Sequence, residues 1–279
     1  DYYRLEDGNP SAGVPVGVWD VMASSGAKSW PLAITRQTVG WCTIPEVSPD
    51  GTYTLYAPDD AGSEAGQASG RCQAVKVKTP FSSSEYFVVE YRQKKSDIYD
   101  LDTKIGGSGF IVYRVNEKHA DVGNITEHGD YVYVFREGET GMARGRPDGA
   151  GTIGTAQVSM PAFASGGNRC EIGSIDISKG LSDGAICYSD GQNSGLRFKP
   201  VEQTDGSITV EISHADWTGA EYWQEVLDST NGTAPFGVLD YPTVDVAAGG
   251  SNMYVLAREQ TMDRACVWKY DTAAKTWGQ

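Results

Sequence analysis

An almost continuous apolar run, Gly109–Val115, limits this chain to folds built around a buried strand. Short runs of β-branched and aromatic residues are typical of strands, and a run without a polar face is typical of a strand covered on both sides. Glu85–Tyr91 has the same character. We therefore predict two neighbouring central strands, with the rest of the chain arranged around their sheet.

Other strand-like segments are shorter and are separated by Gly-rich and polar loops. They are rich in Val, Ile, Thr and Tyr or alternate apolar and polar residues, as expected of strands with one solvated face. We predict strands at Thr52–Tyr56, Gln73–Lys78, Tyr131–Phe135, Ile175–Ile177, Leu196–Phe198, Ser207–Ile212, Pro242–Val246, Ser251–Ala257 and Ala265–Tyr270. Asp205-Gly206 predicts a type I′ hairpin turn, and Leu32–Val39 after Pro31 predicts one short helix.

The predicted fold is therefore mainly β, with a short irregular and helical N-terminal part. Residues 1–50 form that part, and 51–214 form a mixed, sandwich-like β-sheet unit. Residues 218–279 form a small separate β-unit, a candidate partial propeller blade with three strands and a Trp-containing turn. Since three strands cannot cover both of their own faces, we predict that this last unit can self-associate.

Charge and hydropathy disfavour several functions. The sequence contains 23 Lys and Arg residues and 37 Asp and Glu residues, which gives a net charge of −14. This negative charge disfavours a nucleic-acid backbone or an anionic membrane as a partner. No stretch approaches the ~18 consecutive apolar residues of a membrane span. An acidic chain suits an extracellular location and hard cations such as calcium. Asp97, Asp100 and Asp102 bracket one turn and are candidate calcium ligands, with an exposed acidic loop as the alternative.

Five cysteines are present without any C-x-x-C spacing, which excludes zinc-ribbon and thioredoxin-like sites. Two local disulfides are one interpretation, Cys42–Cys72 and Cys170–Cys187, which leaves Cys266 unpaired. Buried reduced thiols are the other. The sequence leaves both open.

Complete catalytic signatures are absent from the sequence. The histidines, His119, His128 and His214, do not form H-E-x-x-H. Gly106-Gly107-Ser108-Gly109 lacks the final glycine of a G-x-S-x-G elbow. From the residues alone, the chain is a β-rich extracellular domain without a visible active site.

Three blocks nevertheless resemble one family. Val18-Trp19-Asp20-Val21-Met22-Ala23, followed by Pro31–Ala33 and Val39–Trp41, is similar to the W-D-[LV]-M-A … P … A … [LV]-G-W pattern of immune inhibitor A-like zinc metallopeptidases. Tyr86–Gln93 and Gly109–Glu117 are similar to two later blocks of that family.

The opening Asp1-Tyr2-Tyr3 is similar to the end of the family's zinc motif, H-E-x-x-H-x-x-G-L-P-D-Y-Y. The resemblance covers about residues 1–213. It implies a secreted, zinc-dependent endopeptidase that hydrolyses protein or peptide substrates. It also implies that both zinc-binding histidines and the catalytic Glu lie upstream of Asp1, so this chain alone is expected to be inactive and to hold no catalytic zinc.

The resemblance assigns roles to particular residues. Asp1 is the candidate third zinc ligand, and Glu6 is a less favoured one. Met22 is expected to form the Met-turn, the apolar floor beneath the metal. Structural support is expected from Trp19, Asp20, Trp41, Glu90 and Arg92. Because Glu90 and Arg92 lie on a strand predicted to be central, they are expected to form an internal ion pair or a hydrogen-bonded support.

The alternative interpretation is a non-catalytic adhesion or carbohydrate-binding module. Sugar rings stack on exposed aromatic side chains, and the C-terminal third of the chain contains several of these. The candidates are Trp217, Tyr222, Trp223, Trp268 and Trp277.

Overall fold

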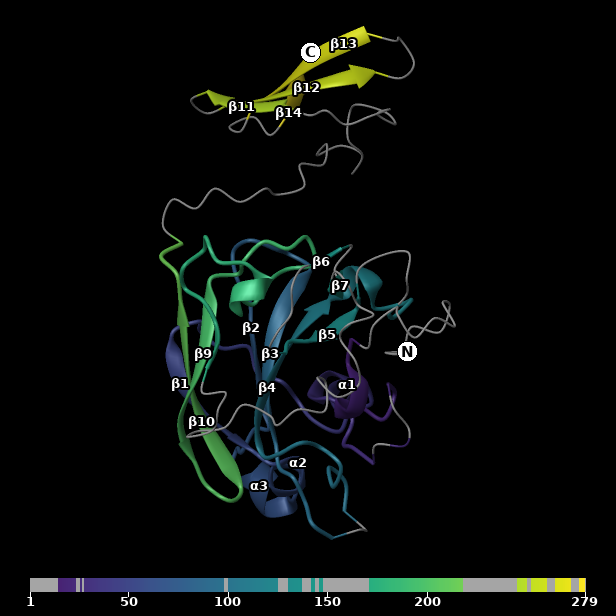
Figure 1. Ribbon diagram of the computed structural model, residues 1–279, viewed down its shortest axis with the longest axis vertical. Coiled ribbons are helices and arrows are strands. Elements are labelled where there is room, and N and C mark those ends of the chain that lie inside the picture. Colours follow the sequence, from purple (N-terminus) through teal and green to yellow (C-terminus); the bar gives the residue numbers. More distant parts are fainter. Residues whose placement is uncertain are drawn as a thin grey trace. The chain divides into compact units, whose positions relative to one another are not determined.

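The structure is a computed structural model (Figure 1). It describes residues 15–23, 26, 28–97, 100–124, 130–136 and 171–217, and the backbone of six further strands at 142–143, 146–147, 245–249, 252–259, 264–271 and 276–278. The chain divides into two compact units, residues 1–222 and 223–279, which are described separately.

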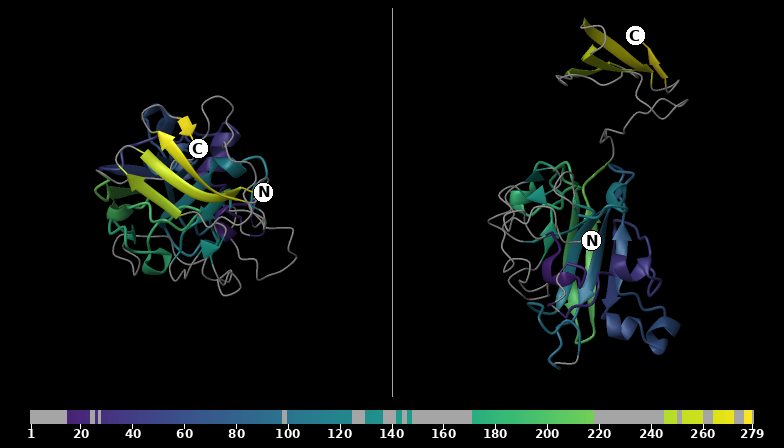
Figure 2. Two further views of the ribbon diagram at one scale, coloured as in Figure 1. Left: turned by 90° about the horizontal axis from the view of Figure 1, so that it is seen from above. Right: turned by 90° about the vertical axis from the view of Figure 1, so that its right-hand side faces the viewer.

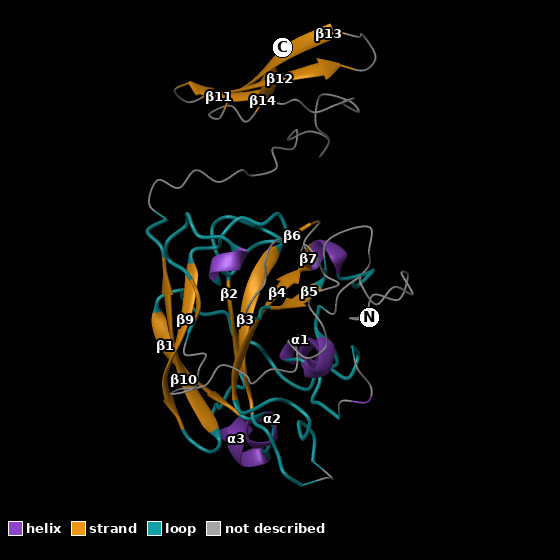
Figure 3. Ribbon diagram, viewed as in Figure 1, coloured by secondary structure: helices purple, strands orange, loops and turns teal. Residues whose placement is uncertain are grey.

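The first unit is built from two four-stranded antiparallel sheets, drawn as orange arrows in Figure 3. The central sheet has the order β2 (Ala74–Val77), β3 (Glu85–Arg92), β4 (Gly109–Asn116) and β5 (Val132–Val134). The outer sheet has the order β1 (Gly51–Tyr56), β10 (Ser207–His214), β9 (Leu196–Gln203) and β8 (Ile172–Gly173). The short strands β6 (Met142–Ala143) and β7 (Arg146–Pro147) pair with each other. The prediction of a mainly β, sandwich-like fold is confirmed.

The central sheet is covered on both faces, which explains its nearly continuous apolar sequence. All eight residues of β4 are buried, and β3 is buried from its second residue onward. The two strands are antiparallel neighbours, with Val89 opposite Val112. The predicted pair of buried central strands is therefore confirmed.

One face of the central sheet packs against the outer sheet, as the edge-on view in Figure 2 shows. This core joins Phe87 and Phe110 of the central sheet to Leu55, Phe198 and Val210 of the outer one. The strands β9 and β10 of the outer sheet alternate buried and more exposed residues, because only one of that sheet's faces is covered.

The opposite face of the central sheet packs against the N-terminal segment. Trp19, Leu32 and Ile34 of that segment contact a core that includes Val88 and Tyr113 of the sheet. The first unit therefore has three layers, and the N-terminal part lies against the innermost sheet.

The helices among the described residues are all short. They are the 3₁₀ turns η2 (Gly17–Trp19), η4 (Glu117–His119) and η6 (Leu181–Asp183) and the α-helices α1 (Ala33–Thr38), α2 (Pro58–Ala61) and α3 (Glu64–Ala68). The helix predicted at Leu32–Val39 is α1. No helix among the described residues is long and apolar enough to span a membrane.

Two local predictions are wrong. Ile175–Ile177 forms a turn rather than a strand, because Asp176 accepts a hydrogen bond from the Ser178 N–H and donates its own N–H to Ser174 Oγ. Such local side-chain bonds replace the ladder of a sheet. Asp205-Gly206 does connect β9 and β10, yet neither residue has the positive φ that a type I′ turn requires.

The second unit is a four-stranded antiparallel meander. Its strands are β11 (Asp245–Gly249), β12 (Asn252–Glu259), β13 (Arg264–Asp271) and β14 (Thr276–Gly278). The segment around Trp277, which the sequence predicted as a turn, is the fourth strand. Self-association of this unit stays a prediction.

Cys42 and Cys72 are thiols, so the Cys42–Cys72 disulfide is not formed. Their sulfur atoms lie near different carbonyl groups, those of Ala33 and Thr54 respectively. Cys187 is also a thiol, so the Cys170–Cys187 disulfide is not formed either. The side chain of Cys266 lies outside the described residues.

Helix α3 offers a direct test of the local structure. Ser63 precedes it, and its Oγ accepts a hydrogen bond from the Gly66 N–H at 3.0 Å. Ser63→Ala should lower the free energy of unfolding by about 1 kcal/mol, because an N-terminal N–H loses its acceptor. Ser69→Ala at the opposite end is the matched control and should cost less, because Ser69 Oγ only adds a donor to the Ala65 and Gly66 carbonyls. Urea denaturation of both variants checks this, and equal losses would contradict it.

Candidate functional site

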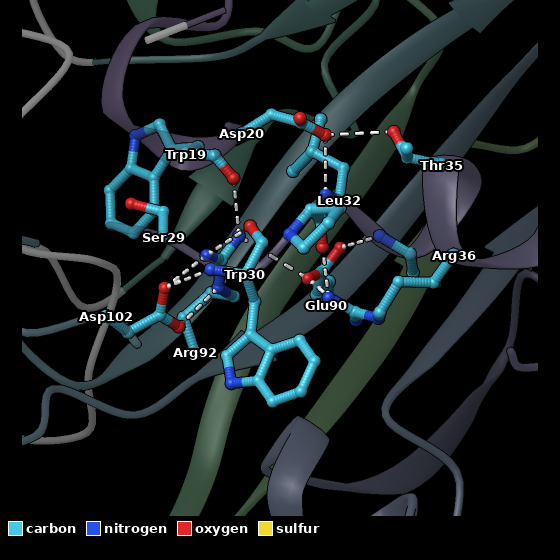
Figure 4. Close-up of polar contacts among 12 residues, drawn as sticks. Trp19, Asp20, Ser29, Trp30, Leu32, Thr35, Arg36, Glu90, Arg92 and Asp102 are labelled. Atoms are coloured by element: carbon cyan, nitrogen blue, oxygen red, sulfur yellow. Dashed lines mark hydrogen bonds and ion pairs between the residues drawn. The ribbon is translucent and has the colours of Figure 1, made fainter. Parts of the chain in front are cut away.

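The candidate site lies where the central sheet meets the N-terminal segment (Figure 4). Successive residues of a strand point to opposite faces, so Glu90 and Arg92 of β3 share the face of Val88. Phe87 points the other way, into the core between the sheets. The strand thereby presents two charged side chains to α1 and to the turns before it.

Arg92 is fully buried and uses its guanidinium to connect three segments. Its Nε and Nη2 bond Asp102 Oδ2 and Oδ1 at 2.8 and 2.5 Å, a two-point ion pair. Its Nη1 donates to the Trp19 carbonyl at 2.7 Å, and its Nη2 donates to the Trp30 carbonyl at 2.9 Å. Arg92 therefore ties the N-terminal segment, at Trp19 and Trp30, and the β3–β4 loop to the sheet.

Glu90 is also fully buried and accepts hydrogen bonds at both oxygens. Oε2 accepts from the Ala33 N–H at 2.7 Å and from the Tyr113 hydroxyl at 3.1 Å. Oε1 accepts from Arg36 Nη2 at 3.1 Å and lies 3.5 Å from Arg92 Nη1. Ala33 is the first residue of α1, where a carboxylate is favourable. Glu90 therefore holds α1 on the sheet.

Asp20 fixes the turn that carries Met22. Its Oδ1 accepts from the Met22 N–H at 2.7 Å, and its Oδ2 accepts from the Leu32 N–H at 2.6 Å and from Thr35 Oγ1 at 2.9 Å. The Ala23 N–H donates to the Asp20 carbonyl at 3.0 Å and closes a β-turn. Asp20 thus joins this turn to the start of α1.

The five buried charges nearly balance, with three carboxylates and two guanidinium groups. Each of them is at most 2% exposed: Asp20, Arg36, Glu90, Arg92 and Asp102. Burial alone lowers the pKa of Arg92, but the adjacent Asp102 and Glu90 outweigh it and the pKa is raised. Burial raises the pKa of Asp20, whose direct hydrogen-bond donors are all neutral. Burial and the neighbouring Glu90 also raise the pKa of Tyr113.

The predicted support residues separate into buried and exposed ones. Trp19 is buried, with its ring 5.7 Å from the Arg92 guanidinium carbon. Met22 is 53% exposed, and Trp41 is 62% exposed. Asp20, Glu90 and Arg92 come together in one network with Trp19, whereas Met22 and Trp41 face outward. The zinc-ligand candidates Asp1 and Glu6 lie outside the described residues.

The structure does not bring the three calcium candidates together. Asp102 is buried and accepts from Arg92 and from the Trp30 N–H at 2.9 Å, whereas Asp97 and Asp100 are exposed. Among the described residues, no three His, Cys, Asp or Glu side chains converge as a metal site. Calcium binding here stays a prediction.

Sequence reasoning missed four members of the network. Arg36 and Thr35 lie in α1, Tyr113 lies in β4, and Trp30 contributes its carbonyl. For Tyr113 a signal was present, since the register that places Ile111 opposite Glu90 puts Tyr113 on the same face. No signal pointed to the carbonyl of Trp30.

A cavity of about 340 Å³ adjoins this network. Trp30 and the exposed Trp41 line it together with Arg36, Gln73, Pro58 and Gly62. The aromatic rings can pack against the apolar face of a ligand, while the neighbouring guanidinium and amide can form hydrogen bonds with its hydroxyl groups.

Trp217, one of the aromatic residues suggested for sugar binding, is a packing residue instead. It stacks on His214 with ring centroids 4.1 Å apart and contacts Phe81 edge-on at 5.8 Å. The side chains of Tyr222, Trp223, Trp268 and Trp277 lie outside the described residues.

Comparisons of the chain with protein-family models, curated proteins and solved structures gave no match. The buried network has no solvent-exposed charged group, so its direct contribution is rigidity: it holds the Asp20–Ala23 turn and α1 against the sheet.

Proposed function

We propose that this chain supplies the rigid floor of a secreted zinc-dependent endopeptidase that hydrolyses protein or peptide substrates. Asp1 is the proposed third zinc ligand, with Glu6 as the alternative, and Met22 lies beneath the metal. The residues from Gly51 to His214 are the β-rich scaffold for this floor.

One observation carries the proposal: buried charged side chains hold the backbone of the turn that contains Met22, while the Met22 side chain faces outward. Asp20 bonds the Met22 N–H, and Arg92 bonds the Trp19 carbonyl just before the turn. A zinc site needs ligands and surroundings held in place, because a metal-bound water must stay aligned with the scissile carbonyl. Burying five charges costs desolvation free energy, and a site that must stay rigid gives a reason for this cost.

The first test is the zinc content of the protein with and without the residues that its gene encodes immediately before Asp1. We expect the 279-residue chain to hold no stoichiometric zinc and to cleave no casein. With the preceding residues present, we expect one zinc per chain and cleavage that a chelator abolishes. A preceding sequence without H-E-x-x-H, or one tight zinc held by the 279-residue chain, contradicts the proposal.

The same longer protein tests the individual roles. Asp1→Ala should weaken zinc binding, since a metal ligand is removed, while Glu6→Ala should not. Met22→Ala should lower kcat, and Val21→Ala in the same turn is its matched control, as Val21 is also exposed. If Glu6→Ala releases the zinc and Asp1→Ala does not, the ligand assignment is wrong although the proposed class of enzyme stands.

The cavity beside Trp30 and Trp41 favours a second candidate function, carbohydrate binding by a non-catalytic module. Sugars stack on Trp rings and bond Arg and Gln side chains. Trp41→Ala should then abolish retention on an immobilised polysaccharide, whereas Val39→Ala, an exposed neighbour, should not. Retention unaffected by Trp41→Ala excludes this cavity as the sugar site.

A further inference from the structure

A concave surface between the N-terminal segment and the β3–β4 loop collects positive charge in an otherwise acidic chain. The cavity has a volume of about 680 Å³ and is lined by Lys28, Lys94, Lys95 and Lys104, with Thr103 and Ser108 beside them. These are four of the 23 Lys and Arg residues of a chain whose net charge is −14. Like charges repel, and an anion bound among them would lower that repulsion.

Internal partners neutralise only part of this charge. Lys95 Nζ lies 3.4 Å from Asp59 Oδ2, and Lys104 Nζ donates to the Gly26 carbonyl at 2.9 Å. Within the described residues, the ammonium groups of Lys28 and Lys94 have neither an ion pair nor a hydrogen bond. Two full positive charges are thus free to meet a ligand.

The backbone beneath the cavity is held in an unusual conformation. Lys28 and Asp102 have φ values of 50° and 60°, and they are the non-glycine residues with positive φ in the described part of the chain. The Asp102 N–H donates to the Lys28 carbonyl at 2.8 Å, and the Asp102 carboxylate is held by Arg92. Strained residues persist where the surroundings fix them, and they concentrate at functional sites. Here the buried network fixes the rim of the cavity.

We propose that this cavity binds a small ligand that carries phosphate or sulfate groups. Lysine ammonium groups and hydroxyl donors such as Thr103 suit the oxygen atoms of these anions. The cavity volume is that of a small-molecule site, about 300–1,000 Å³, and the acidic remainder of the chain repels long polyanions. The proposal is independent of peptidase activity.

Titration calorimetry on the full chain tests this with two probes, inorganic tripolyphosphate and a sulfated disaccharide. The double variant Lys28→Gln/Lys94→Gln is compared with Lys179→Gln/Lys199→Gln, which changes the net charge equally at exposed lysines elsewhere. We expect one site, with affinity falling at least about tenfold in the cavity pair and less than about twofold in the control pair. The tighter probe identifies the anion as a phosphate or as a sulfate ester.

Failure of both probes to bind overturns the proposal, as does an equal loss in both double variants, which would indicate attraction by net charge alone. Thermal unfolding of each variant verifies that the fold is intact. Should Lys28→Gln unfold the N-terminal segment, the single variants Lys94→Gln and Lys199→Gln give the same comparison on a folded protein.

Discussion

Replacing Arg92 with methionine should lower the free energy of unfolding by about 3–5 kcal/mol, the range observed when one partner of a buried ion pair is removed. Asp102 and Glu90 would lose their buried counter-charge, and the Trp19 and Trp30 carbonyls would lose their donor. Methionine approximates the length of the aliphatic part of arginine. The decrease in the free energy of unfolding therefore reflects the removed charge more than the removed side-chain volume. Urea denaturation monitored by tryptophan fluorescence measures the change.

Arg71→Met is the matched control for this prediction. Arg71 pairs with Asp60 at 2.7 Å, yet both side chains are more than one third exposed. Solvent weakens such a pair, and its loss should cost at most about 1 kcal/mol. Equal costs for the two substitutions would show that the buried network does not hold the N-terminal layer on the sheet.

Asp20→Ala should lower the free energy of unfolding by about 2–4 kcal/mol. The substitution removes the acceptor of the Met22 N–H, the Leu32 N–H and Thr35 Oγ1, and a buried donor without a partner costs about 1–3 kcal/mol. The substitution should also lower the local stability of the turn at Met22 and of the start of α1. Hydrogen exchange at the amides of Met22 and Leu32 should accelerate more than exchange in β4.

Asp183→Ala is the corresponding control, because Asp183 also accepts a backbone hydrogen bond, from the Gly180 N–H at 3.1 Å, but is exposed. Water can replace this acceptor, so we expect the free energy of unfolding to fall by less than about 1 kcal/mol. If Asp20→Ala leaves exchange at Met22 unchanged, the turn is rigid for another reason, and the support for a Met-turn at this position is lost.

The strands of the first unit were predictable from the sequence where burial produces a simple pattern. The runs at 85–91 and 109–115 lack a polar face because their sheet is covered twice, and the segment at 207–212 alternates because its sheet is covered once. The segment at 175–177 has the composition of a strand, yet Asp176 satisfies its neighbours' backbone groups locally. Local hydrogen bonding of this kind leaves no trace in hydrophobic periodicity.

The candidate site was predictable only in part. Glu90 and Arg92 in an apolar strand had to be paired if buried, and this reasoning led to the observed ion pair. The principal partner of Arg92 is Asp102, which the sequence grouped with Asp97 and Asp100 in an acidic loop. Nothing in the spacing of a loop shows which one of its carboxylates turns inward, because the positive φ of Asp102 depends on contacts with a distant segment.

The order of the outer sheet has a consequence for the time course of synthesis. β1 pairs with β10, and the partners Thr54 and Thr209 are 155 residues apart. At roughly 5–20 residues per second, a ribosome needs about 8 to 30 s to make the intervening chain. During that interval β2 to β5, which pair in sequence order, can form their sheet while Phe87 and Phe110 still face water. The nascent chain therefore exposes one apolar face of the central sheet until β9 and β10 emerge. The yield of folded protein in a cell should depend on chaperones that shield this face.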